Sequence, residues 1–334
     1  MKIGELRKMI KEYDKDNLSY IVAELYKLIP KGVRVDKCVD ELIENGKPPA
    51  GKKKVPKPKK EVYIDEIEID IEMFYENAKE QYYFAPNRII NKKKRSQWRF
   101  EATRYFKDLM IAAKDEENLE DVGKLLEKLY DILTYATRYY TFATTETFSA
   151  IKVPQEEFFK TIISINRKYQ DDKTFITNSI RIADVYPCDY YTSPTMIFKQ
   201  IIPFIETHEM FEYAIETCAS MIKKMRPKLS KMDEKYAIEE RINEISEFAL
   251  SLAIENDELE SGIKFFKKNY ITSREEVKLF VICRILLEYK LFNEYMSEYE
   301  SAVKKGVDPR ESLQRIYNDL LAGKTPDNTA IHLI

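Results

Sequence analysis

Glycine is scarce in this chain, with 8 residues in 334. Glycine supplies the tight turns of strand-rich folds and the phosphate-binding loops of nucleotide-dependent enzymes. Its scarcity therefore favours helices joined by short links over a β-rich fold, and the sequence contains no glycine-rich phosphate loop.

Side chains typical of catalytic and metal sites are equally sparse. There are two histidines, His208 and His332, and four scattered cysteines with no CxxC pair. His208, in "FIETHEMFEY", is expected at the surface of a helix–helix turn, in preference to a role as metal ligand or base. No zinc spacing and no nucleophile elbow occurs. The sequence predicts no catalytic, cofactor-binding or metal-binding residue. An enzyme site built from scattered carboxylates and tyrosines is the lesser alternative.

Long hydrophobic runs and excess charge are also lacking. The longest apolar stretch, "LFVICRILL" at 279–287, contains Arg284 and is too short to span a bilayer. The opening residues do not resemble a signal peptide, and the four cysteines are scattered without a CxxC pair. We therefore expect a cytoplasmic protein with reduced thiols and without membrane association. The balance of Lys+Arg 55 against Asp+Glu 57 argues against a globally basic nucleic-acid binder, so such a role would require a local basic patch.

What the chain has is helical periodicity. Residues 1–45 predict a small helical module, with one apolar face at Leu6, Met9, Ile10 and Tyr13 and a second helix capped by Asp16. A third short helix is expected at 35–43. Residues 46–61 are rich in Lys and Pro without an apolar period, which is typical of a flexible linker. In residues 62–70 isoleucines alternate with acids, and we leave strand or helix open.

Helix-start signals recur through the predicted body, residues 62–322, which precedes a tail at 323–334. They are Pro154, Ser193-Pro194, Asp233, and two capping boxes at 273–276 and 308–311. The starts 154, 194, 233, 273 and 308 lie 40, 39, 40 and 35 residues apart. Most intervals hold two helices of apolar periodicity. A pair of helices repeated at this period indicates a helical-hairpin, solenoid-like array.

Two segments resemble known families. "ALSLAIENDELESGIKFFKKNY" at 249–270 resembles a tetratricopeptide-type repeat, with small Ala253, a polar turn at 256–258 and apolar Ile263 and Phe266. This resemblance implies a helical hairpin. The segment "ELRKMIKEYDKDNLSYIVAELYKLIPK" resembles the start of a group of bacterial helical proteins of unknown function. That likeness implies helices and a bacterial origin, and it implies no activity.

A basic stretch, "NRIINKKKRSQWRF" at 87–100, surrounds the only tryptophan. A helix that begins at Asn87 places four cations within about 60° of one another, beside the apolar stripe that contains Trp98. These cations are Arg88, Lys92, Arg95 and Arg99. They could bind phosphates beside a stacking Trp98, together with the seven linker lysines. The favoured alternative is that their stems cover the apolar edge while their charges pair with the acids of "DEIEIDIE".

Tyrosine is abundant, with 23 residues, and it clusters near the expected helix links. Tyrosine buries apolar area while keeping a polar tip, so it serves both cores and interfaces. The loop at 186–193, with Tyr186, Tyr190 and Tyr191, is the best candidate for an exposed recognition site.

These features together predict an all-α, helical-hairpin repeat protein with a small N-terminal helical module on a flexible linker. We expect a non-enzymatic scaffold or adaptor that binds another, unidentified protein. Nucleic-acid or other polyanion binding through the basic stretch and the linker is the alternative.

Overall fold

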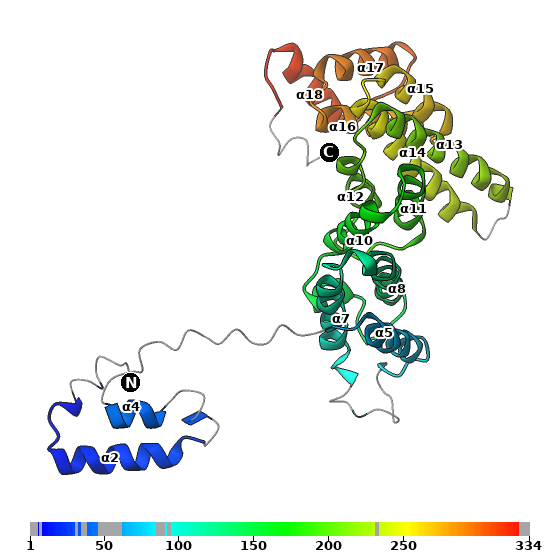
Figure 1. Cartoon of the computed structure of the whole chain (residues 1–334). Helices are drawn as coiled ribbons and strands as arrows, with labels where there is room; N and C mark the ends of the chain where they lie inside the picture. The colour runs from blue at the N-terminus through cyan, green and yellow to red at the C-terminus, as the bar shows by residue number, and fades with distance from the viewer. Residues whose placement is uncertain are drawn as a thin grey trace. The chain divides into compact units, whose positions relative to one another are not determined.

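Figure 1 shows the computed structural model of the chain. The structure describes residues 6, 9–30, 33–34, 39–45, 62–84, 91, 95–230 and 234–326. The chain divides into two units, Met1–Glu61 and Val62–Ile334. The predicted linker at 46–61 and the end of the predicted tail, with His332, lie outside the described residues.

The first unit contains helices α2 (Lys15–Leu28) and α4 (Val39–Asn45). The predicted cap of α2 is wrong. Asp14, not Asp16, is the N-cap, because its extended backbone lets Oδ1 accept the Asn17 N–H at 2.8 Å. The Tyr26 hydroxyl donates to Asp40 at 2.6 Å and so joins the two helices. No side chain among the described residues of this unit is buried.

The helices of the second unit are arranged along it from α5 at one end to α18 at the other (Figure 1). Its α-helices are α5 (Ile64–Lys79), α7 (Trp98–Ala112), α8 (Leu119–Arg138), α9 (Thr147–Ile151), α10 (Gln155–Tyr169), α11 (Asp172–Val185), α12 (Pro194–Lys199), α13 (His208–Met225), α14 (Lys235–Glu255), α15 (Leu259–Asn269), α16 (Glu275–Glu288), α17 (Phe292–Lys304) and α18 (Glu311–Leu321). Short 3₁₀ helices are η1 (Glu116–Asn118), η2 (Ile202–Phe204) and η3 (Arg226–Ser230). The described residues include no strand, so the predicted all-α class is confirmed.

Pairs of helices follow one another at the predicted period. Helices α10, α12, α14, α16 and α18 begin at residues 155, 194, 235, 275 and 311, which lie 39, 41, 40 and 36 apart. Each of the four intervals contains two α-helices. Successive pairs are joined by contacts of α11 with α13 and of α13 with α14. Among the described helices, none has both the length and the apolar character that a bilayer span requires.

The pair α12/α13 departs from the others because α12 is short. The segment "TMIFKQIIPFIE" is apolar enough for a full helix, but α12 ends at Lys199. Pro203 lacks an N–H and its ring clashes with the carbonyl of the fourth residue before it, so an α-helix cannot continue through this position. The chain forms η2 there instead.

Both predicted capping boxes are wrong. Helix α16 begins at Glu275 with Arg274 as N-cap, and the Arg274 N–H is accepted by Thr272 Oγ1, at 3.2 Å. Helix α18 begins at Glu311, with Arg310 as an N-cap that makes no side-chain cap bond. Pro309 therefore precedes the cap and does not occupy the first helical position. The Ser193 cap of α12 is confirmed, whereas Asp233 lies outside the described residues.

Residues 62–70, left open between strand and helix, lead into α5. Ile67 and Ile71 are buried, while Ile69 is 62% exposed. In a strand all three would share one face, whereas in a helix residues 67 and 71 lie one turn apart and residue 69 points away. Two acids of "DEIEIDIE", residues 65–72, pair with cations of later helices. Asp70 binds Arg104 at 2.8 Å, and Glu72 binds Lys128 of α8.

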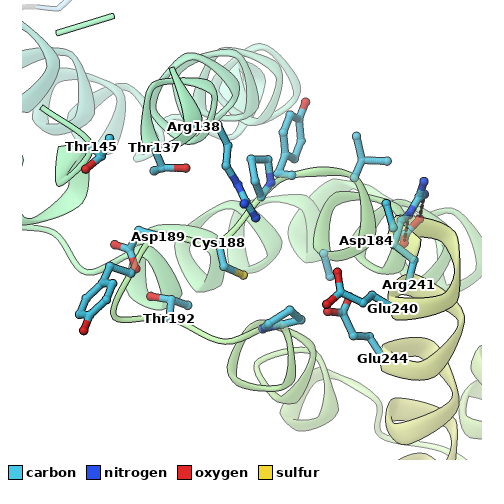
Figure 2. A pocket seen from close by; sticks show the side chains of 17 residues that line it. Thr137, Arg138, Thr145, Asp184, Cys188, Asp189, Thr192, Glu240, Arg241 and Glu244 are labelled. Carbon is cyan, nitrogen blue, oxygen red and sulfur yellow. Dashed lines mark hydrogen bonds and ion pairs between the residues drawn. The ribbon is translucent and has the colours of Figure 1, made fainter. Parts of the chain in front are cut away.

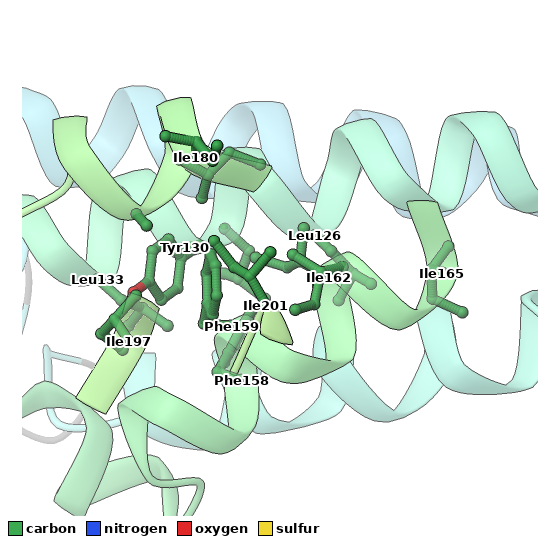
Figure 3. Packing of buried hydrophobic residues seen from close by; sticks show 14 of the residues in the cluster. Leu126, Tyr130, Leu133, Phe158, Phe159, Ile162, Ile165, Ile180, Ile197 and Ile201 are labelled. Atoms are coloured by element: carbon green, nitrogen blue, oxygen red, sulfur yellow. The ribbon is translucent and has the colours of Figure 1, made fainter. Parts of the chain in front are cut away.

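Tyr130 of α8 belongs to the larger hydrophobic cluster, lies beside Phe159 and Leu133 (Figure 3) and is 1% exposed. Its ring centroid is 5.7 Å from Phe148 and 5.6 Å from Phe158. This cluster extends from α5 to α14, and a second cluster extends from α14 to α18. Tyr130 also contacts the loop after α11, so the core reaches the predicted recognition site.

Candidate functional site

The loop between α11 and α12 carries two of the most exposed aromatic side chains of the described residues. Tyr190 is 89% exposed and Tyr191 is 60% exposed. Their rings meet edge to face, with centroids 5.2 Å apart and an interplanar angle of 89°. Tyr186 differs, because it is half-buried, packs edge-on against Tyr130, and its hydroxyl donates to Glu127 at 3.0 Å. Tyr186 therefore anchors the loop while the other two tyrosines face solvent.

A buried glutamine holds the loop in place. Gln155, the first residue of α10, is fully buried. Its Nε2 donates to the Pro187 carbonyl at 2.9 Å and to the Tyr130 hydroxyl at 3.0 Å, and its Oε1 accepts the Asp189 N–H at 2.7 Å. A buried amide with all these partners holds the loop backbone at Pro187 and Asp189 in one conformation.

The tip of the loop is shaped by an aspartate turn. Asp189 Oδ1 accepts the Tyr191 N–H at 3.0 Å, a side-chain turn that stands in for a backbone turn. Ser193 then caps α12 by accepting the Met196 N–H at 3.3 Å. The two exposed tyrosines thus project from a backbone held at both ends, so they lose little conformational freedom on binding a partner.

A cavity of about 650 Å³ opens beside this loop, between the end of α8 and the first turns of α14 (Figure 2). Its lining contains four carboxylates and two arginines. These residues are Asp184, Asp189, Glu240, Glu244, Arg138 and Arg241. Figure 2 shows Arg138 directed toward Cys188, with Glu240 and Glu244 on the opposite wall.

The charges of the cavity are unequally neutralised. Arg241 binds Asp184 through both Nε, at 2.8 Å, and Nη2, and the Asp184 side chain is only 3% exposed. Among the described residues, no hydrogen bond or ion pair reaches the Glu244 carboxylate. Burial, reinforced by the negative charges of Glu240 and Asp184, raises the pKa of Glu244 to about 7. A cation in the cavity would relieve this accumulation of negative charge.

The thiol in the cavity is inert. Burial, followed by the charges of Glu244 and Asp189, raises the pKa of Cys188 to about 12. Because the thiolate is the nucleophilic form, Cys188 stays protonated and unreactive at neutral pH. The other cysteines that the structure describes, Cys218 and Cys283, are buried free thiols.

A second cavity, of about 330 Å³, also borders the loop. Its lining includes the apolar side chains of Phe148, Val153 and Met196, and also Tyr191. Asp189 and Thr192 line both cavities. The 186–193 loop therefore borders both a charged hollow and a more apolar one.

The predicted anion site is only partly within the described residues. Asn87, Arg88 and Lys92 lie outside them. Arg95 is half-buried, and its Nη1 donates to the Phe84 carbonyl at 3.3 Å. Arg99 is exposed, with its guanidinium carbon 4.9 Å from the centre of the Phe100 ring.

Trp98 belongs to the core. It is 4% exposed and stacks on Phe142 with centroids 4.2 Å apart and an interplanar angle of 12°. A base could stack on this ring only after Phe142 had moved away. The surface aromatic next to the basic residues is Phe100, which is 63% exposed.

The exposed tyrosines could be identified from the sequence, whereas the residues that support them could not. One feature of the sequence could have identified Gln155: it is a polar residue on the apolar stripe that contains Phe158, Phe159 and Ile162 in α10. Glu240 and Glu244 lie one turn apart on a helix, which is too common a pattern to mark a site.

Comparison with protein-family models, curated proteins and solved structures finds no match to this chain. Function must therefore be argued from the site.

Proposed function

We propose that this protein is a non-enzymatic scaffold that binds a segment of a partner protein at the 186–193 loop. The observation that carries this proposal is the exposure of Tyr190 and Tyr191 on a backbone held by Gln155. Tyrosine is enriched among the residues that dominate binding energy, since it contributes large apolar area at low conformational cost. The two hollows beside the loop give a partner's side chains places to enter.

The partner segment carries at least one lysine or arginine. Four carboxylates face two arginines in the larger cavity, and one arginine is already committed to Asp184. A cationic side chain near Glu240 and Glu244 would lower the raised pKa of Glu244, because an opposite charge favours the ionised carboxylate. Binding near neutral pH therefore releases a proton from Glu244.

Selection from a random peptide library displayed on phage, with the full-length chain as bait, tests this function. We expect selected peptides to contain Lys or Arg and to bind at least about tenfold more weakly to the Tyr190→Ala/Tyr191→Ala variant. Tyr63→Ala is the matched control, since Tyr63 is 59% exposed at the N-cap of α5. Equal affinity of the selected peptides for the wild-type protein and the double variant would refute the proposal.

Calorimetry of a selected peptide in buffers of different ionisation enthalpy tests the charge argument. The wild-type protein should release protons on binding near neutral pH, and Glu244→Gln should abolish that release. Proton release that persists in Glu244→Gln would contradict the assignment to Glu244.

Polyanion binding remains the second candidate, and the position of Arg99 favours it. Arg99 is exposed beside the exposed ring of Phe100, and the sequence adds the linker lysines. The test is binding of a fluorescent single-stranded oligonucleotide across a salt titration, with Arg99→Ala as the variant. Phosphate contacts make affinity fall steeply with salt. No affinity at low salt would end this candidate.

The scaffold proposal includes the tetratricopeptide-like architecture and a cytoplasmic location. The close approach of α15 to α14 at Gly262 and Ala253 supports the first, since small residues let two helices of a hairpin approach closely. The free thiols of Cys188, Cys218 and Cys283 support the second, because disulfides are rare in reducing compartments.

A further inference from the structure

Three potential metal ligands converge where α13 meets the turn between α14 and α15. His208 is the first residue of α13, Glu212 lies one turn later, and Glu258 is the N-cap of α15. One donor atom from each of these side chains lies within 4.8 Å of the other two. His208 Nε2 and Glu212 Oε1 lie 3.3 Å apart. The site shares no residue with either cavity beside the 186–193 loop.

The distance of 3.3 Å between His208 Nε2 and Glu212 Oε1 matches that between two ligands of one metal ion. Zinc bonds to histidine nitrogen and carboxylate oxygen are about 2.0–2.1 Å long, which places two tetrahedral ligands about 3.3 Å apart. Glu258 must approach within the same range. It can do so by side-chain rotation, because the glutamate is partly exposed and, among the described residues, its carboxylate makes a single weak contact, from Ser261 Oγ at 3.4 Å.

A further residue orients the imidazole. His208 Nδ1 lies 2.8 Å from Asn256 Oδ1, at the C-cap of α14. Nδ1 donates in this contact because a carbonyl oxygen can only accept, so in neutral His208 the lone pair is on Nε2. Nε2 is also the nitrogen beside Glu212. An imidazole whose second nitrogen donates to a carbonyl is the usual arrangement around protein-bound metals.

We propose that His208, Glu212 and Glu258 bind a first-row divalent transition-metal ion, with Zn²⁺ as the representative probe. His208 binds through Nε2, each glutamate provides one oxygen, and Asn256 positions the imidazole. The imidazole ligand favours zinc-like ions over Mg²⁺ and Ca²⁺, which select oxygen. A cation at the start of α13 opposes the helix dipole, but the two carboxylates balance its double charge.

The exposure of the ligands has two consequences. The His208 and Glu212 side chains are 60% and 54% exposed, so an ion reaches them without opening of the fold. Three protein ligands leave a tetrahedral ion with one open position, which a water or a side chain of another molecule can fill. The ion would tie α13 to the α14–α15 turn and stabilise the packing of these helices.

The test is calorimetric titration of the untagged, metal-free full-length chain with ZnCl₂ at neutral pH. We expect one site, weakened at least about tenfold by His208→Ala, Glu212→Gln or Glu258→Gln, and about 10- to 100-fold by Asn256→Ala. His332→Ala is the matched control, because it removes the other histidine of the chain and should leave the affinity unchanged. Excess Mg²⁺ should not compete.

Two measurements separate loss of ligation from loss of folding. Without metal, the thermal unfolding of the variants should match that of the wild-type protein, since the altered side chains are partly or largely exposed. With Zn²⁺, the unfolding temperature should rise in the wild-type protein and not in His208→Ala. Absence of zinc binding, equal affinity of His208→Ala, or a Co²⁺ complex with thiolate charge-transfer bands would each overturn the proposal.

Discussion

Replacement of Gly262 by alanine should destabilise the protein, against the usual effect of this substitution. In most helix interiors Gly→Ala stabilises by about 0.5–1 kcal/mol, because alanine has less freedom to lose on folding. Gly262 lies inside α15, where an added Cβ would be 2.5 Å from Ala253 Cβ and 3.2 Å from Leu250 Cδ1. Carbon atoms in favourable contact are about 3.5–4.0 Å apart, so α15 must move by about 1 Å.

The expected net effect follows from these opposed contributions. Overpacking of this kind typically costs about 1–3 kcal/mol, which exceeds the gain in helix propensity. We therefore expect Gly262→Ala to lower the free energy of unfolding by about 1–2 kcal/mol, measured from the urea midpoint by circular dichroism. In an Ala253→Gly background the methyl group has room, and the same substitution should become stabilising.

Gly123 provides the comparison within the same chain. A Cβ there would be 2.6 Å from Asn166 Oδ1 and 2.7 Å from the Tyr169 hydroxyl, which are the far ends of longer side chains, whereas the Ala253 Cβ is bonded directly to the backbone. Gly123→Ala should therefore destabilise less than Gly262→Ala. A Gly262→Ala variant as stable as the wild-type protein would contradict the close contact of α14 and α15. So would an effect of Gly262→Ala that is the same with and without Ala253→Gly.

Three further predictions follow from single contacts. Because the pKa of Glu244 is raised from 4.5 to about 7, the folded protein loses stability as pH rises through that interval. Glu244→Gln should therefore unfold at a higher urea concentration than the wild-type protein at about pH 8, but not at about pH 4.5. Gln155→Ala leaves buried groups of the loop unpaired, at a cost of about 1–3 kcal/mol, and should speed chymotrypsin cleavage after Tyr190 and Tyr191. Trp98, the only tryptophan, should show blue-shifted emission that iodide quenches poorly until the protein unfolds.

Each of these predictions has an opposing result. An equal stability difference at both pH values would show that Glu244 does not titrate as inferred. Unchanged cleavage in Gln155→Ala would mean that other contacts hold the loop. Iodide quenching of the native protein as strong as that of the unfolded chain would contradict the burial of Trp98.

The helices could be predicted because periodicity and local start signals act over a few residues. The near-even starts of α10, α12, α14, α16 and α18 differ from the predicted ones by three residues or fewer. The exact starts were harder to predict, because a capping side chain competes with backbone geometry. At Pro309 the ring disfavours a helical conformation in the preceding Asp308, and the helix starts only after Arg310, whose ψ is 147°.

The site was less predictable because its supports come from distant parts of the chain. The exposed pair Tyr190 and Tyr191 could be found from a local cluster in an expected loop. The contact of Gln155 with Asp189 spans 34 residues, and the cavity brings together Arg138 and Glu244 from α8 and α14. No local pattern specifies that these elements meet, since their meeting depends on how successive helix pairs pack.

The aromatic residues show which part of a helical pattern carries functional information. Trp98 looked like a stacking platform, yet it lies on the apolar stripe of α7, and that stripe is what the fold buries. Phe100, two residues later, points to the opposite side of the helix and is 63% exposed. Tyr190 and Tyr191 escape burial because they lie in a loop. An aromatic residue outside the apolar stripe gains little from the core, so in a helical array such residues are the stronger candidates for recognition of a partner.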